Sequence, residues 1–128
     1  MAIDMHLIYT IVLLVHGLGH LLGVISIVGG LIKSPGFTTT SWVLTNRLGL
    51  SETIVRALGV LWLVPTVGFV ASALGFWSDL DWWRPLTWVM VAFSVVLLTL
   101  WWKSFTANIP IQANIGNIVV IVGLLWLT

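Results

Sequence analysis

Two histidines near the start of the chain are the residues best suited to chemistry. They lie in the run His16-Gly17-Leu18-Gly19-His20. Positions four apart share one face of an α-helix, so both imidazoles should point the same way. Residues 5–32 around them contain no Asp, Glu, Lys or Arg, which indicates a membrane-spanning helix. Ionisable side chains are costly inside a bilayer, and by default they indicate a functional site.

The residue types limit what this histidine pair binds. A zinc site usually takes at least three protein ligands, and neither Asp4 nor Glu52 is placed to be the third. We therefore expect no metal site. Haem held by two histidines needs them on opposite faces of its ring, which one helix face does not supply. A haem or pigment with one axial ligand stays open, and the sequence assigns no cofactor.

Two carboxamides of the last span should reach the depth of the histidines. At about 1.5 Å per residue, His20 lies about 20 Å from the start of its span, and Asn114 and Asn117 lie about 21 and 16 Å from the same face. Thr66 and Ser94 fall at comparable levels. In one interpretation the histidines hydrogen-bond to an asparagine or a backbone carbonyl and fasten the helices. In the other, His16 and His20 bind a cofactor, pigment or small hydrophobic ligand, supported by Asn114 and Asn117.

Several classes of protein are disfavoured by what the sequence lacks. No acid lies within a predicted span, so the usual proton or cation relay of a transporter is missing. The chain contains no P-loop, no dinucleotide fingerprint and no nucleophile beside an evident base. It has no cysteine and a net charge of +1, which disfavours thiolate chemistry and nucleic-acid binding. We expect a protein that is not an enzyme and does not bind nucleic acid.

The composition predicts the fold that positions these residues. Of the 128 residues, 59% are hydrophobic and 7% are charged, whereas soluble domains carry about a quarter charged residues. Long uncharged stretches predict transmembrane helices near 7–31, 55–77, 85–102 and 110–127. We therefore expect a single all-α integral membrane domain over residues 1–128, a four-transmembrane-helix bundle without a separate soluble domain.

Local signals refine the boundaries of these helices. Ser51 can cap a helix whose first turn carries Glu52, and Glu52 can pair with Arg56 four residues later. Pro65 should kink the second span. Residues 41–48, in the long first loop, suit a short helix lying at the membrane interface.

The charges and tryptophans predict how the bundle sits in a membrane. Lys33, Arg47, Arg56 and Lys103 fall at one end, and Arg84 alone among the basic residues falls at the other. By the positive-inside rule, both termini should be extracytoplasmic. Seven tryptophans lie toward span ends, as in an aromatic belt: Trp77, Trp82, Trp83, Trp88, Trp101, Trp102 and Trp126.

Small residues recur at the spacing that lets membrane helices approach closely. The pairs are Gly19/Gly23, Gly68/Ser72, Ala71/Gly75 and Gly116/Gly123. Four helices in one small chain cannot use all these faces internally. Besides the lipid bilayer, we therefore expect other membrane subunits, or further copies of this chain, as partners.

Three short motifs occur in a familiar order. They are His16-Gly17-x-x-His20-x-x-Gly23, the run from Arg56 to Leu63, and Ala113-Asn114-Ile115-Gly116-Asn117-Ile118. In this the chain resembles a group of small, largely uncharacterised bacterial four-helix membrane proteins that are broadly DoxX-like, although its first loop is longer. The resemblance implies a bacterial inner (cytoplasmic) membrane and, through links of similar proteins to redox systems, an accessory role.

Two functions follow from these observations. The first is a non-catalytic structural or accessory subunit of a larger membrane complex of redox or energy-converting type. The alternative is a membrane binder of a cofactor, pigment or small hydrophobic ligand, which would use His16 and His20.

Overall fold

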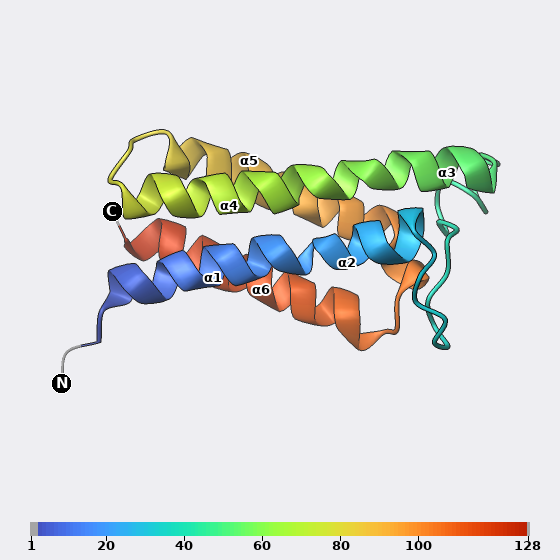
Figure 1. Ribbon diagram of the computed structural model, residues 1–128, viewed down its shortest axis with the longest axis horizontal. Coiled ribbons are helices and arrows are strands. Elements are labelled where there is room, and N and C mark those ends of the chain that lie inside the picture. The colour runs from blue at the N-terminus through green and yellow to red at the C-terminus, as the bar shows by residue number, and fades with distance from the viewer. Residues whose placement is uncertain (1–2, 128) are drawn as a thin grey trace.

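The computed structural model describes residues 3–127, and within them every regular element is helical. Consecutive helical elements join end to end into four long helical rods. These rods lie side by side (Figure 1). In chain order the elements are α1 (Met5–Gly19), α2 (Leu21–Gly23), the π-helical turn η1 (Val24–Val28), α3 (Glu52–Leu58), the 3₁₀ turn η2 (Gly59–Trp62), α4 (Leu63–Trp77), α5 (Trp83–Leu100), the 3₁₀ turn η3 (Trp102–Ser104) and α6 (Asn108–Trp126).

The rods match the four spans expected from the sequence. Met5–Val28, Glu52–Trp77, Trp83–Leu100 and Asn108–Trp126 are each long and apolar enough to cross a membrane. The first rod begins where the Asp4 side chain accepts a hydrogen bond from the Leu7 amide. It ends three residues earlier than predicted, ahead of Gly30, whose φ of 59° is a left-handed conformation that favours glycine.

Two rods contain irregular turns that lie against each other. Pro65 lacks an N–H and its ring crowds the preceding turn, and the turn just before α4, η2, is a 3₁₀ turn. The π-helical turn η1 packs on η2. A Cβ on Gly59 would lie 2.7 Å from Ile27 Cγ2, so this close contact depends on a glycine.

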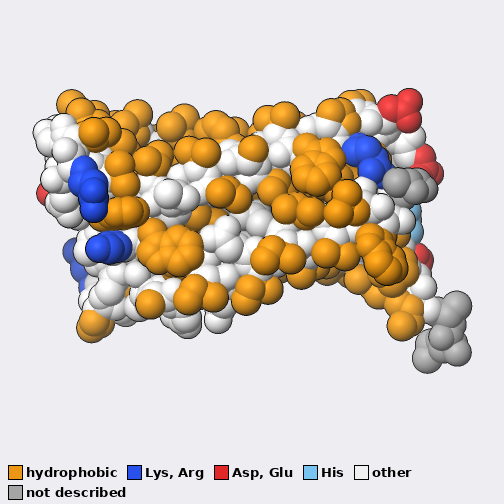
Figure 2. Space-filling view, turned by 180° about the vertical axis from the view of Figure 1, so that it is seen from behind, with side chains coloured by type: hydrophobic (Ala, Val, Ile, Leu, Met, Phe, Trp, Pro, Cys, Tyr) orange, Lys and Arg blue, Asp and Glu red, His pale blue; other side chains and the backbone are white. Residues whose placement is uncertain are grey.

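Both described ends of the chain lie at one end of the bundle, here called the terminal end (Figure 1). The long segment 29–51 lies at the opposite end, here called the loop end. Charges separate in the same way: Lys and Arg gather at the loop end, and Asp residues dominate the terminal end (Figure 2). The surface between them is apolar on the face shown.

The prediction of a short interfacial helix at 41–48 is wrong, because this segment forms consecutive turns. The Ser41 hydroxyl donates to Leu100 O and also accepts from the Leu44 amide. The Trp42 indole donates to Thr99 O over 2.8 Å. Such side-chain bonds to the backbone compete with a helix, and here they attach the loop to the end of α5.

The expected ion pair between Glu52 and Arg56 does not form. Arg56 instead donates to Val28 O over 2.8 Å, and Glu52 accepts from the Thr39 hydroxyl. The last carbonyls of a helix have no partner within it, so a guanidinium at the end of η1 satisfies one of them. The cap predicted at Ser51 is confirmed by its bond from the Ile54 amide.

Two apolar clusters fill the bundle, one in each half. The cluster of the terminal half consists of Tyr9, Leu13, Phe69, Ala73, Phe76, Trp83, Met90, Val91, Val120 and Leu124. The cluster of the loop half consists of Ile27, Val55, Trp62, Leu97, Leu98, Trp101 and Phe105. Buried or half-buried polar side chains lie between the two clusters and form a polar stretch at mid-length: His16, His20, Thr66, Ser94 and Asn117.

The tryptophans predicted to form a belt differ in their exposure. Trp77, Trp82, Trp88 and Trp126 are exposed near the bundle ends. Trp83 and Trp101 point inward and are buried in the two clusters. A position at a span end fixes the depth of a residue along the helix, but the rotation of the helix decides whether its side chain faces inward.

Candidate functional site

The polar stretch at mid-length contains most of the residues that the sequence singled out. His20, Ser94 and Asn117 are buried there, and His16 is half-buried beside them. His16 lies on α1, His20 lies between α1 and α2, Ser94 lies on α5 and Asn117 lies on α6. The structure therefore brings the histidine pair together with Asn117 and adds Ser94, which the sequence marked only by its depth.

Four hydrogen bonds join these residues in a closed ring. His16 Nε2 lies 2.7 Å from Asn117 Oδ1, and Asn117 Nδ2 lies 3.1 Å from Ser94 Oγ. His20 Nε2 lies 2.7 Å from the same hydroxyl, and its Nδ1 lies 2.8 Å from His16 O. The ring fastens α1 to α5 and α6, which includes the hydrogen bond between histidine and asparagine considered from the sequence.

Asn114 fixes the orientation of Asn117 from outside the ring. Asn114 Nδ2 donates to Pro110 O over 3.2 Å, and a carbonyl can only accept. Asn114 therefore presents its oxygen to Asn117, whose amide nitrogen lies 3.4 Å away. As a result, the Asn117 nitrogen faces Asn114 and Ser94, and its oxygen faces His16.

The same logic assigns the proton on each neutral imidazole. His20 Nδ1 must carry its proton because its partner, His16 O, is a carbonyl. His20 Nε2 is then an acceptor, and the Ser94 hydroxyl donates to it. His16 carries its proton on Nε2, because that atom faces the Asn117 oxygen. The imidazole lone pair that accepts no hydrogen bond within the ring is on His16 Nδ1.

His16 Nδ1 lies beside the backbone of Gly116 on α6. A Cβ on Gly116 would be 2.6 Å from this nitrogen, so glycine provides the space for the ring. Within residues 3–127, Nδ1 has no hydrogen-bond partner, and it is not one of the polar atoms sealed inside the protein. His16 also lines a cavity, so its ring borders a space that a ligand can occupy.

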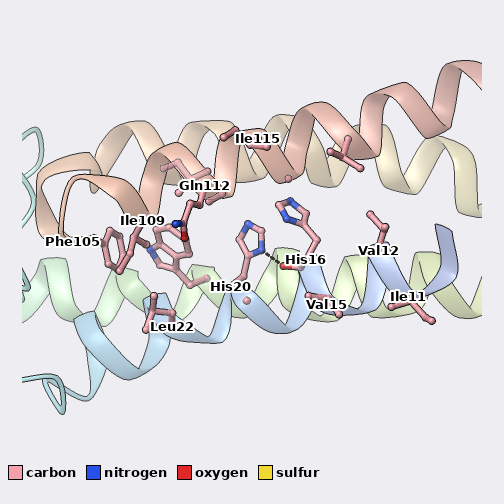
Figure 3. Close-up of a pocket in the computed structure, with 17 residues that line it drawn as sticks. Ile11, Val12, Val15, His16, His20, Leu22, Phe105, Ile109, Gln112 and Ile115 are labelled. Carbon is pink, nitrogen blue, oxygen red and sulfur yellow. Dashed lines mark hydrogen bonds between the residues drawn. The ribbon is translucent and has the colours of Figure 1, made fainter. Parts of the chain in front are cut away.

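The cavity has a volume of about 670 Å³ and lies between α1 and α6. We call it the α1–α6 groove. Both histidines project into it from α1 toward α6 (Figure 3). Its lining is mostly apolar and consists of Ile11, Val12, Val15, His16, Gly19, His20, Leu22, Gly23, Trp62, Leu98, Phe105, Ile109, Gln112, Ala113, Ile115, Gly116 and Val119.

The groove has a closed floor and an open side. Trp62, Leu98 and Phe105 are buried and form the floor. The rim residues on α1 and α6 are exposed, among them Val15 at 64% and Ile115 at 54%. The groove therefore opens sideways, on the outer surface of the bundle, rather than at either end.

The side-chain rings of Tyr9 and His16 separate α1 from α6, and this separation accounts for the groove. Tyr9 packs on Gly123, where a Cβ would clash with its ring, and its hydroxyl donates to Val120 O over 2.8 Å. His16 packs on Gly116 two turns further along. Because whole aromatic rings lie between the two backbones, α1 and α6 stay apart and leave room beside His16.

Sequence reasoning missed two features of the groove. Trp62 at the floor drew attention only as part of a family-like motif, and Gln112 at the rim drew none. The signal for Gln112 was its polarity in an apolar span. The sequence also treated the two histidines alike, whereas the hydrogen bonds occupy both nitrogens of His20 and leave one of His16 free.

Comparisons of the chain with protein-family models, with curated proteins and with solved structures found no match. The resemblance to DoxX-like proteins therefore stays a prediction. Function has to be inferred from the geometry of the groove and its hydrogen-bonded ring.

Proposed function

We propose that this is an integral membrane protein that binds a small lipophilic ligand in the α1–α6 groove, with His16 as the polar contact. The supporting observation is the combination of an apolar groove of about 670 Å³ with one free ring nitrogen. Small-molecule sites typically enclose about 300–1,000 Å³, with apolar walls and few polar groups. His16 and Gly116 supply the polar contact and the space beside it.

The ligand reaches the groove from the lipid. His16 lies eleven residues after Met5, the first residue of α1, which is about 16 Å along a helix and about half of a 30 Å hydrocarbon core. The exposed rim at this level faces acyl chains when the bundle spans a bilayer. A molecule already dissolved in the membrane can therefore enter sideways without passing through water.

Specificity in such a groove comes from its polar contact and its shape. Lipid tails are as apolar as the groove walls, so an apolar molecule gains little by leaving them. The free nitrogen of His16 is the feature that lipid does not offer. The hydrogen-bonded ring holds the imidazole in place, so its orientation is set before a ligand arrives.

Blocking the groove tests the proposal. Gly19 lies on the rim, and a Cβ there meets nothing within 4 Å, so Gly19→Leu adds a bulky side chain at the opening from a position where the Cβ itself has room. Ala92→Leu adds a similar side chain at an exposed position on α5 that does not line the groove. We expect mass spectrometry of organic extracts to find a lipophilic molecule with the wild type and Ala92→Leu, and much less with Gly19→Leu. Identical extracts from all three proteins would contradict the proposal.

A visible absorption spectrum separates a colourless ligand from a pigment. The natively purified protein should show no Soret or chlorophyll-like band. If such a band is present and is lost in His16→Leu, the occupant is a haem or pigment with His16 as its axial ligand.

We further propose that the protein lies in a bacterial inner membrane with both termini outside the cytoplasm. The support for the orientation is the gathering of Lys and Arg side chains at the loop end (Figure 2). The basic residues of the loop-end segments are Lys33, Arg47, Arg56 and Lys103. The natural chain has no cysteine, so single cysteines report position cleanly. In intact cells, a membrane-impermeant maleimide should label Ser78→Cys and spare Ser34→Cys. The reverse pattern would invert the topology.

The accessory-subunit role is the second candidate, and exposed Gly19 favours it. Most small residues that suggested an interface instead contact side chains of this chain: Gly23, Gly68, Gly75, Gly116 and Gly123. Gly19 is left bare on the outer surface, where a helix of another protein could lie against it. Co-purification of a membrane protein that is lost in Gly19→Leu would favour this role over the small ligand.

A further inference from the structure

We infer that the ligand carries a hydroxyl group that donates a hydrogen bond to His16 Nδ1, which makes it a lipophilic alcohol or phenol. This inference rests on the proposed function of the α1–α6 groove. It excludes ketones, esters and quinones as the preferred class, because their oxygens only accept hydrogen bonds.

Groups outside the groove fix the lone pair on His16. The ring could in principle form with donor and acceptor exchanged along the Asn117 and Ser94 bonds. This exchange would turn the Asn117 oxygen toward the Asn114 oxygen, and Asn114 is held by Pro110 O. The reversed ring would also require His20 to donate from both nitrogens, because His16 O still accepts from one of them. Both changes are unfavourable, so neutral His16 keeps its proton on Nε2 and offers an acceptor at Nδ1.

Among the described residues, the groove offers no competing donor at the depth of His16. Both nitrogens of His20 are occupied within the ring. The Trp62 indole N–H is sealed by protein atoms and does not reach the groove surface. Gln112 offers both a donor and an acceptor, but it is exposed at the rim one turn from Gly116 toward the loop end. A ligand beside His16 therefore meets an acceptor only.

The membrane from which the ligand comes also favours a hydroxyl compound in the groove. A hydroxyl dissolved among acyl chains has no hydrogen-bond partner, and this is costly. Moving it beside His16 Nδ1 supplies the missing acceptor, whereas a carbonyl gains nothing there. The groove therefore selects hydroxyl compounds from a mixture of equally apolar molecules.

A matched pair of probes tests the inference. 4-Octylphenol can donate a hydrogen bond, and its methyl ether, 4-octylanisole, cannot. Binding of both to the full chain in lipid nanodiscs would be measured by ligand-observed NMR. We expect the phenol to bind about tenfold more tightly, which is the effect of one well-placed hydrogen bond.

The variant His16→Leu removes the acceptor at Nδ1 and leaves an apolar side chain in its place. We expect this protein to bind the two probes equally. As a readout independent of folding in the variant, ¹⁵N NMR of the wild-type histidines should show His16 protonated at Nε2, with a bare Nδ1 that shifts when the phenol binds.

Different experimental results would overturn the inference and the proposed function. Equal binding of phenol and ether to the wild type, or a His16 ring protonated at Nδ1, would overturn the inference and leave the binding groove standing. Absence of saturable binding for both probes would overturn the proposed function itself.

Discussion

Helix α1 packs against α4 on one side and against α6 on the other, and the two seams are built differently. At the α4 seam the glycine belongs to α1: a Cβ on Gly17 would lie 2.9 Å from Phe69 Cβ and 3.1 Å from Thr66 O. At the α6 seam the glycines belong to α6, where Gly116 and Gly123 receive the rings of His16 and Tyr9. The first seam brings two backbones together, and the second keeps them a ring's width apart.

This difference shows how one small bundle can combine a rigid core with a binding groove. Glycine opposite a backbone closes a helix seam, because no side chain lies between the helices. Glycine opposite an aromatic ring accommodates that ring but leaves the helices separated on either side of it. The ring of His16, Asn117, Ser94 and His20 then fixes how α1, α5 and α6 are aligned.

The largest effect is expected when the closed seam is disturbed. Gly17→Ala places a methyl group against α4, where the neighbours include the Thr66 carbonyl and the Val70 amide nitrogen. Backbone cannot move aside cheaply, so we expect a loss of about 2 kcal/mol in unfolding free energy. Unfolding in mixed micelles followed by circular dichroism would measure it.

Gly19→Ala is the matched control, two residues away on the same helix. A Cβ there meets nothing within 4 Å, so alanine should be neutral or stabilise by up to about 1 kcal/mol through helix propensity. If the two variants are equally stable, the seam with α4 is not closed by Gly17.

An intermediate effect is expected from the hydrogen-bonded ring. Ser94→Ala removes the partner of His20 Nε2 and of one Asn117 N–H. We expect a loss of about 1 kcal/mol, since hydrogen bonds within membrane proteins are individually modest. Ser72→Ala is the control, because Ser72 is equally buried but its hydroxyl has no partner within residues 3–127. Equal losses in the same unfolding measurement would show that the ring does not fasten the bundle.

The smallest effect on stability is expected at the open seam. In Gly116→Ala the three atoms nearest to the new methyl group all belong to the His16 side chain, which moves aside more easily than backbone does. We expect a change of less than about 1 kcal/mol, because improved helix propensity offsets part of the strain. The methyl group also covers Nδ1, so affinity for 4-octylphenol should fall. A stability loss as large as that of Gly17→Ala would show that the two seams are equally tight.

The sequence by itself determined the four spans and the depth of the polar residues. Both depend on local properties: the length of an apolar run sets a transmembrane helix, and a rise of 1.5 Å per residue sets depth along it. His16, His20 and Asn117 could therefore be expected at one level. The bond from His20 to Ser94 on α5 could not be predicted, because depth does not specify which helices are neighbours.

Only the tertiary structure decided which faces turn inward and which nitrogen is left free. Lipid and protein interior are both apolar, so the pattern of hydrophobic residues along a membrane helix says little about its rotation. For this reason Trp83 and Trp101 were expected at the surface but are buried. The open nitrogen of His16 depends on Asn114 and the Pro110 carbonyl, nearly 100 residues away in the chain. Contacts over such a separation arise from helix packing and leave no local pattern in the sequence.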